Sequence, residues 1–189
     1  MGRRLAGREG GRTFVKLRTI VLQAILAVYL YFLVKIILFK GHSADVSLLT
    51  EQLKIGFQEP ARILTRIKQG NLIPLHEITS ALNAGTGHSS MNLYGNFLIF
   101  VPLGLLLAAL GARKGTRSAK NVLAISFFLS LALEMSQAIF SIGSFDVDDL
   151  ILNTAGGMAG CALYALFAKA GRKKADEPDY ESDTTVKSS

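Results

Sequence analysis

The chain has 189 residues, of which 50% are hydrophobic and only 19% are charged, and its formal net charge is +7. A mean hydropathy of +0.35 and long apolar blocks argue against an ordinary soluble protein and predict membrane-spanning helices. The basic residues flank these blocks and form no face with interleaved aromatics, which argues against nucleic acid as a partner; the single cysteine, Cys161, excludes an intramolecular disulfide and a cysteine-based metal site.

In chain order, residues 1–18 mix arginine and lysine with glycine and are predicted to be a flexible basic N-terminal segment. The apolar run at 19–39 is longer than the core of a cleaved signal peptide, about 7–15 residues, and is therefore predicted to be a retained first span. In the connector at 40–91, leucine and isoleucine recur at helical spacing beside charged residues. This pattern favours short amphipathic helices at the membrane surface, separated at Pro60 and Pro74.

Three further apolar runs predict spans at residues 93–111, 121–142 and 150–168. A basic loop at 112–120 and an acidic connector at 143–149 separate them. The polar residues 169–189 predict a basic stop followed by a disordered cytoplasmic tail. The predicted fold class is an all-α membrane protein, with residues 19–168 forming a four-span transmembrane helical bundle.

The distribution of lysine and arginine predicts how this bundle is oriented. The N-terminal segment, the 112–120 loop and the stretch after the last span are rich in basic residues, whereas the 143–149 connector has none. The positive-inside rule then places both termini in the cytoplasm. The 40–91 connector becomes a partly helical extracytoplasmic loop.

Polar side chains gather at one depth of the predicted bundle, in the outer leaflet. An ionisable group at membrane depth costs about 2.5–3.5 kcal/mol, so it seldom lies there without a partner or a function. Within each span the polar residues are three or four positions apart and share a helix face. The predicted cluster comprises Asn92 and Asn96 on span two, Glu134 and Gln137 on span three, and Asp146, Asp148, Asp149 and Asn153 in and after the acidic connector.

Three interpretations of this cluster remain open. Its members hydrogen-bond to one another and only hold the bundle together, or they line a binding or catalytic pocket open to the outer surface, or they bind a hard cation. The pocket is favoured, because interhelical hydrogen bonds are worth only about 0.6–2 kcal/mol each. In the cation alternative Glu134, Asp146, Asp148 and Asp149 are oxygen ligands for Ca²⁺ or Mg²⁺, although the run lacks the frame of an EF-hand. Asp146 or Asp149 is also suited to be the N-cap of the last span.

Several spaced motifs resemble those of the VanZ-like membrane proteins. They are Asn71-Leu72-Ile73-Pro74, Asn92-x-x-Gly95-Asn96, Phe100-Val101-Pro102-Leu103-Gly104, Glu134-x-x-Gln137, Gly143-Ser144-Phe145-Asp146-Val147-Asp148-Asp149 and Asn153-Thr154-x-Gly156-Gly157 with Gly160. The resemblance covers roughly residues 70–168. It implies a small multi-pass protein of the bacterial cytoplasmic membrane, in a family whose founding member is associated with resistance to teicoplanin. Many of these relatives carry an arginine where this chain has Ser144.

The function expected from these observations is binding of a lipid-linked envelope component or a lipoglycopeptide, with lowered sensitivity to that antibiotic. In this hypothesis Glu134 is the central acid, Asp146 and Asp149 hold polar head groups or a cation, and the amides of Asn92, Asn96, Gln137 and Asn153 orient the ligand. The alternative is a membrane enzyme with Glu134 as general acid or base on a lipid-linked substrate. Membrane lipids are the expected partners, no resident cofactor is predicted, and the oligomeric state is left open.

Overall fold

The computed structural model describes residues 2–39, 46–84, 87–114 and 119–175, and all the elements within them are helical. Four helices contain stretches long and apolar enough to cross a membrane, at Val15–Leu38, Leu93–Ala112, Ala119–Ile139 and Val147–Arg172. The predicted four-span helical bundle is therefore confirmed. The helices are α1 (Gly2–Leu38), α2 (Val46–Gln58), α3 (Pro60–Gln69), α4 (His76–Ala84), α5 (Gly87–Lys114), α6 (Ala119–Ile139) and α7 (Val147–Ala175).

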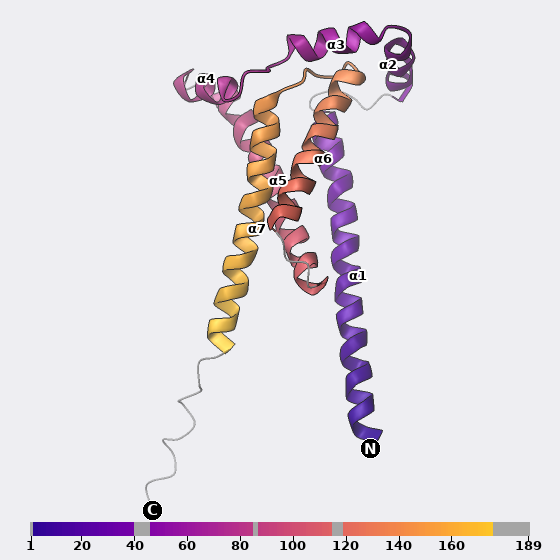
Figure 1. Cartoon of the computed structure of the whole chain (residues 1–189), viewed down its shortest axis with the longest axis vertical. Coiled ribbons are helices and arrows are strands. Elements are labelled where there is room, and N and C mark those ends of the chain that lie inside the picture. Colours follow the sequence, from indigo (N-terminus) through magenta and orange to yellow (C-terminus); the bar gives the residue numbers. More distant parts are fainter. Residues whose placement is uncertain (1, 40–45, 85–86, 115–118, 176–189) are drawn as a thin grey trace, which may run out of the picture.

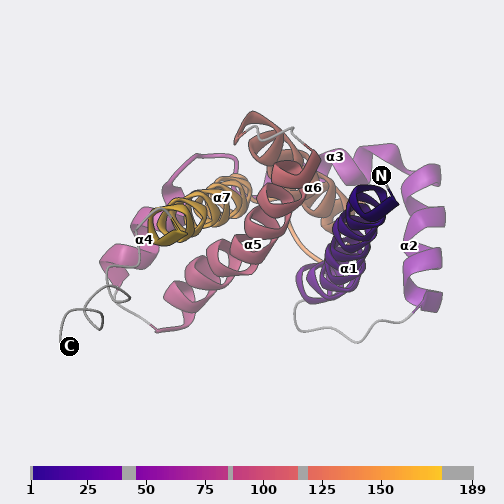
Figure 2. The ribbon, with the colours of Figure 1, turned by 90° about the horizontal axis from the view of Figure 1, so that it is seen from below.

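The short helices α2, α3 and α4 lie across one end of the bundle, where α6 turns into α7 (Figure 1). We call residues 46–84 the cap and residues 140–146 the connector. The start of α1 and the end of α7 lie at the opposite end (Figure 1). Viewed from that opposite end, α5 lies between α7 on one side and α1 on the other (Figure 2).

Helices α5 and α7 approach backbone to backbone through glycines. A Cβ built on Gly104 would lie 1.8 Å from the carbonyl oxygen of Gly157, and one on Gly160 would lie 1.9 Å from that of Val101. Gly156 is equally restricted, with the Phe97 carbonyl oxygen 2.0 Å away. Small residues permit such close packing in membranes, where the hydrophobic effect does not drive helices together. The Gly-x-x-x-Gly pattern on the fourth span thus marks a real helix contact.

The apolar core lies in the half of the bundle nearer the cap. It is formed by Leu33 and Ile37 of α1, Phe100 and Leu103 of α5, and Leu133 of α6. The Tyr29 hydroxyl donates a hydrogen bond to the Ile99 carbonyl in the turn before Pro102. These contacts attach α1 to α5 and α6.

Two helix boundaries differ from the sequence-based prediction, which placed the connector at 143–149. Helix α6 ends at Ile139 because Ser141 adopts a left-handed conformation (φ 57°), and the Ile142 N–H then donates to the Gln137 carbonyl at 3.1 Å. Helix α7 begins at Val147 because Asp146 is its N-cap, accepting the Asp148 N–H at 2.7 Å. Consequently Asp148 and Asp149 belong to the first turn of α7.

The two ends of the chain also differ from expectation. Helix α1 already begins at Gly2, where the sequence predicts a flexible lead-in over residues 1–18. Helix α7 continues through the basic stop to Ala175. The remainder of the predicted tail, residues 176–189, lies outside the described residues.

Candidate functional site

Asp148 fastens helix α4 to the start of α7. Its side chain is 0% exposed, and its carboxylate accepts hydrogen bonds from the backbone N–H groups of Leu75, Glu77 (2.7 Å) and Ile78 (3.2 Å). The carboxylate therefore lies at the N-terminus of α4, where the helix dipole favours a negative charge. Leu75 has φ 66°, an uncommon conformation for leucine, and its N–H points to this carboxylate. Both carboxylate oxygens of Asp148 thus accept hydrogen bonds from backbone N–H groups of the cap.

Asp146 joins the cap to α6. Its Oδ1 accepts a hydrogen bond from Asn71 Nδ2 at 2.9 Å, and its backbone N–H donates to Glu134 Oε2 at 2.9 Å. The carbonyl of Asn71 accepts the Val147 N–H, also at 2.9 Å, which pairs the two segments in parallel. A Cβ on Gly70 would lie 2.0 Å from the Phe145 carbonyl oxygen, so the cap backbone lies directly on the connector.

The amides of Gln137 and Asn153 make contacts deeper in the bundle. Gln137 Nε2 donates to the Ile37 carbonyl at 2.9 Å, which satisfies a carbonyl at the C-terminal end of α1. Asn153 Nδ2 donates to Ser130 Oγ at 2.9 Å, linking α7 to α6. Both amides are buried, so each one fixes a helix pair.

The eight predicted site residues belong to α5, α6, the connector and α7, at the ends of these helices nearer the cap. Asp148 and Asp149, which the sequence placed in the connector, lie instead in the first turn of α7. Direct contact between the eight residues and a ligand stays a prediction, as does the general acid or base role of Glu134. The side chain of Asn92 lies outside the described residues. Of the other seven, Asp146 and Asp149 are partly buried, and the remainder are buried: Asn96, Glu134, Gln137, Asp148 and Asn153.

The described residues include no group of three or more histidine, cysteine, aspartate or glutamate side chains placed to hold a metal ion. The cation alternative thus gains no support from this part of the chain. For Asp148 to bind a cation, its carboxylate would have to give up the hydrogen bonds that it accepts from backbone N–H groups.

A cavity of about 400 Å³, here called the cap cavity, opens beside this network. From α3 it takes Arg62, Thr65, Arg66 and Gln69, whose spacing places them on one helix face, and from the connector it takes Gly143 and Ser144. Among the described residues neither guanidinium group forms an ion pair or hydrogen bond.

The connector wall of the cap cavity packs against Gln137, one of the buried hydrogen-bonding residues. A Cβ on Gly143 would lie 3.2 Å from the Gln137 Cβ, so the connector packs directly on the side chain that holds α1. Sequence reasoning missed the two arginines and also Asn71. The arginines could have been found from the helical spacing of the basic residues in α3. Asn71 could have been found from Asn71-Leu72-Ile73-Pro74, a composition typical of an Asx turn. This turn forms here, with the Ile73 N–H donating to Asn71 Oδ1 at 3.2 Å.

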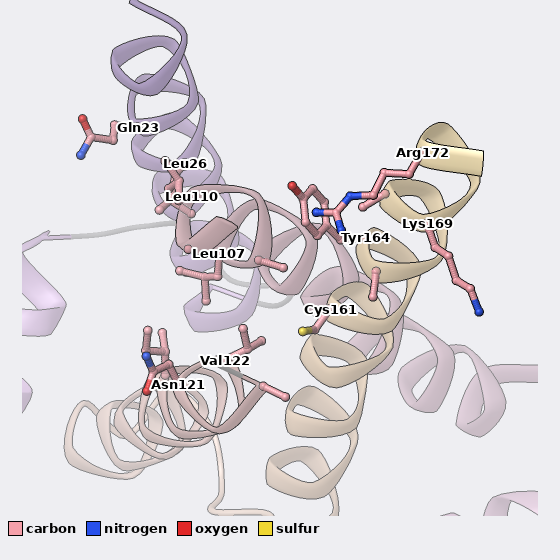
Figure 3. Close-up of a pocket in the computed structure, with 16 residues that line it drawn as sticks. Gln23, Leu26, Leu107, Leu110, Asn121, Val122, Cys161, Tyr164, Lys169 and Arg172 are labelled. Carbon is pink, nitrogen blue, oxygen red and sulfur yellow. The ribbon is translucent and has the colours of Figure 1, made fainter. Parts of the chain in front are cut away.

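A second cavity, the transmembrane cavity, has a volume of about 640 Å³ and lies toward the end opposite the cap. All four spans contribute to its walls, which are mainly apolar (Figure 3). None of the eight predicted site residues lines either of these two cavities.

Exchanging Asn71 for aspartate tests the contact between the cap and the connector. Asn71→Asp replaces the donor to Asp146 by a second carboxylate at hydrogen-bond distance, so we expect a loss of at least about 2 kcal/mol in unfolding free energy. Asp146→Asn in the same chain restores a donor–acceptor pair and should recover most of the loss. Thermal unfolding in detergent measures the four-variant cycle, and strictly additive effects would contradict the contact.

Comparison with known proteins agrees with this architecture. A model of the VanZ/LLP1 family matches residues 26–168, which include the cap and most of the four spans. The chain is 42% identical over 82 residues to Protein VanZ of Enterococcus faecium, an alignment covering 43% of this chain and 49% of that relative. The match therefore spans about half the length of the relative. No solved structure matches the chain.

Proposed function

The chain belongs to the VanZ/LLP1 family, and from that membership we propose that it lowers bacterial sensitivity to lipoglycopeptide antibiotics of the teicoplanin type. In this proposal it resides in the cytoplasmic membrane with both termini in the cytoplasm and the cap on the outer surface. The polar end of the bundle binds a lipid-linked envelope component or the antibiotic itself.

The observation that carries the binding proposal is the pair of arginines in the cap cavity. Arginine pairs with phosphate or carboxylate in a planar, often bidentate geometry, and Arg62 and Arg66 are one helical turn apart on the same face. Gln69 and Ser144 add neutral hydrogen-bonding groups. A cavity of about 400 Å³ is within the range of sites that hold small ligands or head groups.

The position of α3 supports a ligand at the level of lipid head groups. Helix α3 lies across the end of the spans (Figure 1), and the apolar side chains of Phe57 and Leu64 are 83% and 53% exposed on α2 and α3. Apolar side chains beside basic ones are typical of helices that lie in the membrane interface. A phosphate-bearing lipid head group is therefore the ligand class that we favour.

In this proposal the buried acids hold the cap in place and the cap cavity meets the ligand. The enzyme alternative needs a substrate to reach Glu134, which is 1% exposed and whose Oε2 already accepts the Asp146 N–H. The binding function needs no such rearrangement. The geometry therefore favours binding over catalysis.

Drug susceptibility of a sensitive Gram-positive host tests the proposal. Wild type should protect against teicoplanin but not vancomycin, because teicoplanin carries a lipid tail that holds it at the membrane surface beside the cap and vancomycin carries none. The double variant Arg62→Gln with Arg66→Gln removes two charge-assisted contacts, so ligand affinity should fall by roughly 100-fold and protection should disappear.

The matched control is Lys54→Gln with Lys68→Gln, which removes the same charge from exposed positions outside the cap cavity. All chains are compared at equal membrane abundance. Equal loss of protection in both double variants would show that overall charge matters and the cavity does not. No protection by the wild type would overturn the proposed function.

A further inference from the structure

The transmembrane cavity is a separate feature from the cap cavity and belongs to the other end of the bundle. Its walls come from α1, α5, α6 and α7. The apolar residues that line it include Leu107, Val122, Cys161 and Ala165. Figure 3 shows the Cys161 sulfur directed toward the α6 side, where Val122 lies. A mainly apolar wall favours an apolar chain over a polar solute.

The length of the cavity matches one leaflet of a bilayer. Along α7 it extends from Cys161 to Arg172, a rise of about 16 Å at roughly 1.5 Å per residue. Half of a hydrocarbon core about 30 Å thick is about 15 Å. An acyl chain that enters from the membrane surface at Arg172 would therefore reach the bilayer centre near Cys161.

The rim of the cavity is basic. Lys169 and Arg172 line it at the end of the span, and both side chains are exposed. In Figure 3, Arg172 extends toward Tyr164 and Lys169 extends to the other side of α7. Helix α6 begins at Ala119 on the same rim and contributes the partial positive charge of a helix N-terminus. Charges of this sign attract an anionic head group.

We propose that the transmembrane cavity binds one acyl chain of an anionic phospholipid from the leaflet opposite the cap, with the lipid phosphate at Arg172 and with Lys169 adding to the positive potential of the rim (Figure 3). This site is independent of the proposed function, because it needs neither the cap cavity nor an antibiotic.

Cys161 makes the site measurable, because it is the only cysteine in the chain and lies in the cavity wall. The full chain is placed in nanodiscs of phosphatidylglycerol or of phosphatidylcholine and treated with a small membrane-permeant maleimide. Wild type should be labelled more slowly in phosphatidylglycerol, on the order of tenfold, because the basic rim holds that lipid in place. Native mass spectrometry should then find phosphatidylglycerol retained on the protein in preference to phosphatidylcholine.

Lys169→Gln with Arg172→Gln should abolish both differences, whereas Lys16→Gln with Arg18→Gln, with equal charge loss outside the cavity, should keep them. Ala165→Phe fills the cavity and should remove the retained lipid, and Ala162→Phe on the same helix should not. Equal labelling and equal retention of the two lipids in wild type would overturn the proposal. So would a dimer with Cys161 protected in both lipids, because a second copy would then fill the cavity.

Discussion

Replacing Asp148 with alanine is expected to release helix α4 from the bundle. The carboxylate is fully buried and accepts three backbone N–H groups, and alanine leaves these donors without their partner. Hydrogen bonds to charged groups are worth about 1.5–3 kcal/mol each, so we expect a loss of roughly 3 kcal/mol or more in the free energy that holds the cap. Loss of the charge at the α4 N-terminus adds to this effect.

Hydrogen–deuterium exchange measures the release directly, because the amides of Leu75, Glu77 and Ile78 should exchange faster in Asp148→Ala than in wild type. Glu77→Gln is the control, since it removes an exposed acid from the same helix turn. Exchange should stay slow along α6, whose hydrogen bonds are internal to the helix. Unchanged protection of residues 75–78 would refute an anchoring role for Asp148.

The second large effect is expected from Gly104→Ala. Its new Cβ would lie 1.8 Å from the Gly157 carbonyl oxygen, and backbone cannot move aside as a flexible side chain can. Helices α5 and α7 must therefore separate, at a cost at or above the upper end of the roughly 1–3 kcal/mol typical of overpacking. We expect a large drop in unfolding temperature and in membrane abundance.

Gly95→Ala and Gly171→Ala are matched controls on the same two helices, because a Cβ at either position meets nothing within 4 Å. In a helix these exchanges should be neutral or stabilise by about 0.5–1 kcal/mol. Unfolding of the four proteins in detergent separates the two explanations. If Gly104→Ala unfolds at the same temperature as the controls, the close contact between α5 and α7 is wrong.

Much of the fold could be predicted from apolar run length, because a membrane leaves few choices for a chain of this composition. The four spans and the contact made by Gly156 and Gly160 follow from patterns within single helices. The common level of Glu134, Asp146 and Asn153 also follows, since helical rise converts sequence position into depth. These features need no knowledge of how the cap folds.

The hydrogen-bond partners could not be predicted in the same way. Asp148 accepts hydrogen bonds from backbone N–H groups seventy or more positions away, and backbone groups carry no sequence signal. The end of α6 was placed too late because Ser141, where glycine is usual, adopts the left-handed conformation that ends the helix. The arginines of the cap cavity were missed because only the folded cap brings α3 against Ser144.

The central claim is that the buried acids support the cap and the cap cavity performs the binding. Teicoplanin susceptibility of hosts making Glu134→Gln or the Arg62→Gln, Arg66→Gln pair, at matched membrane abundance, tests it most directly. Glutamine can still accept the Asp146 N–H, so Glu134→Gln should keep most of the protection, whereas the arginine pair should lose it. Abolished protection in Glu134→Gln, with full protection in the arginine pair, would contradict the claim and favour an enzyme with Glu134 as its acid or base.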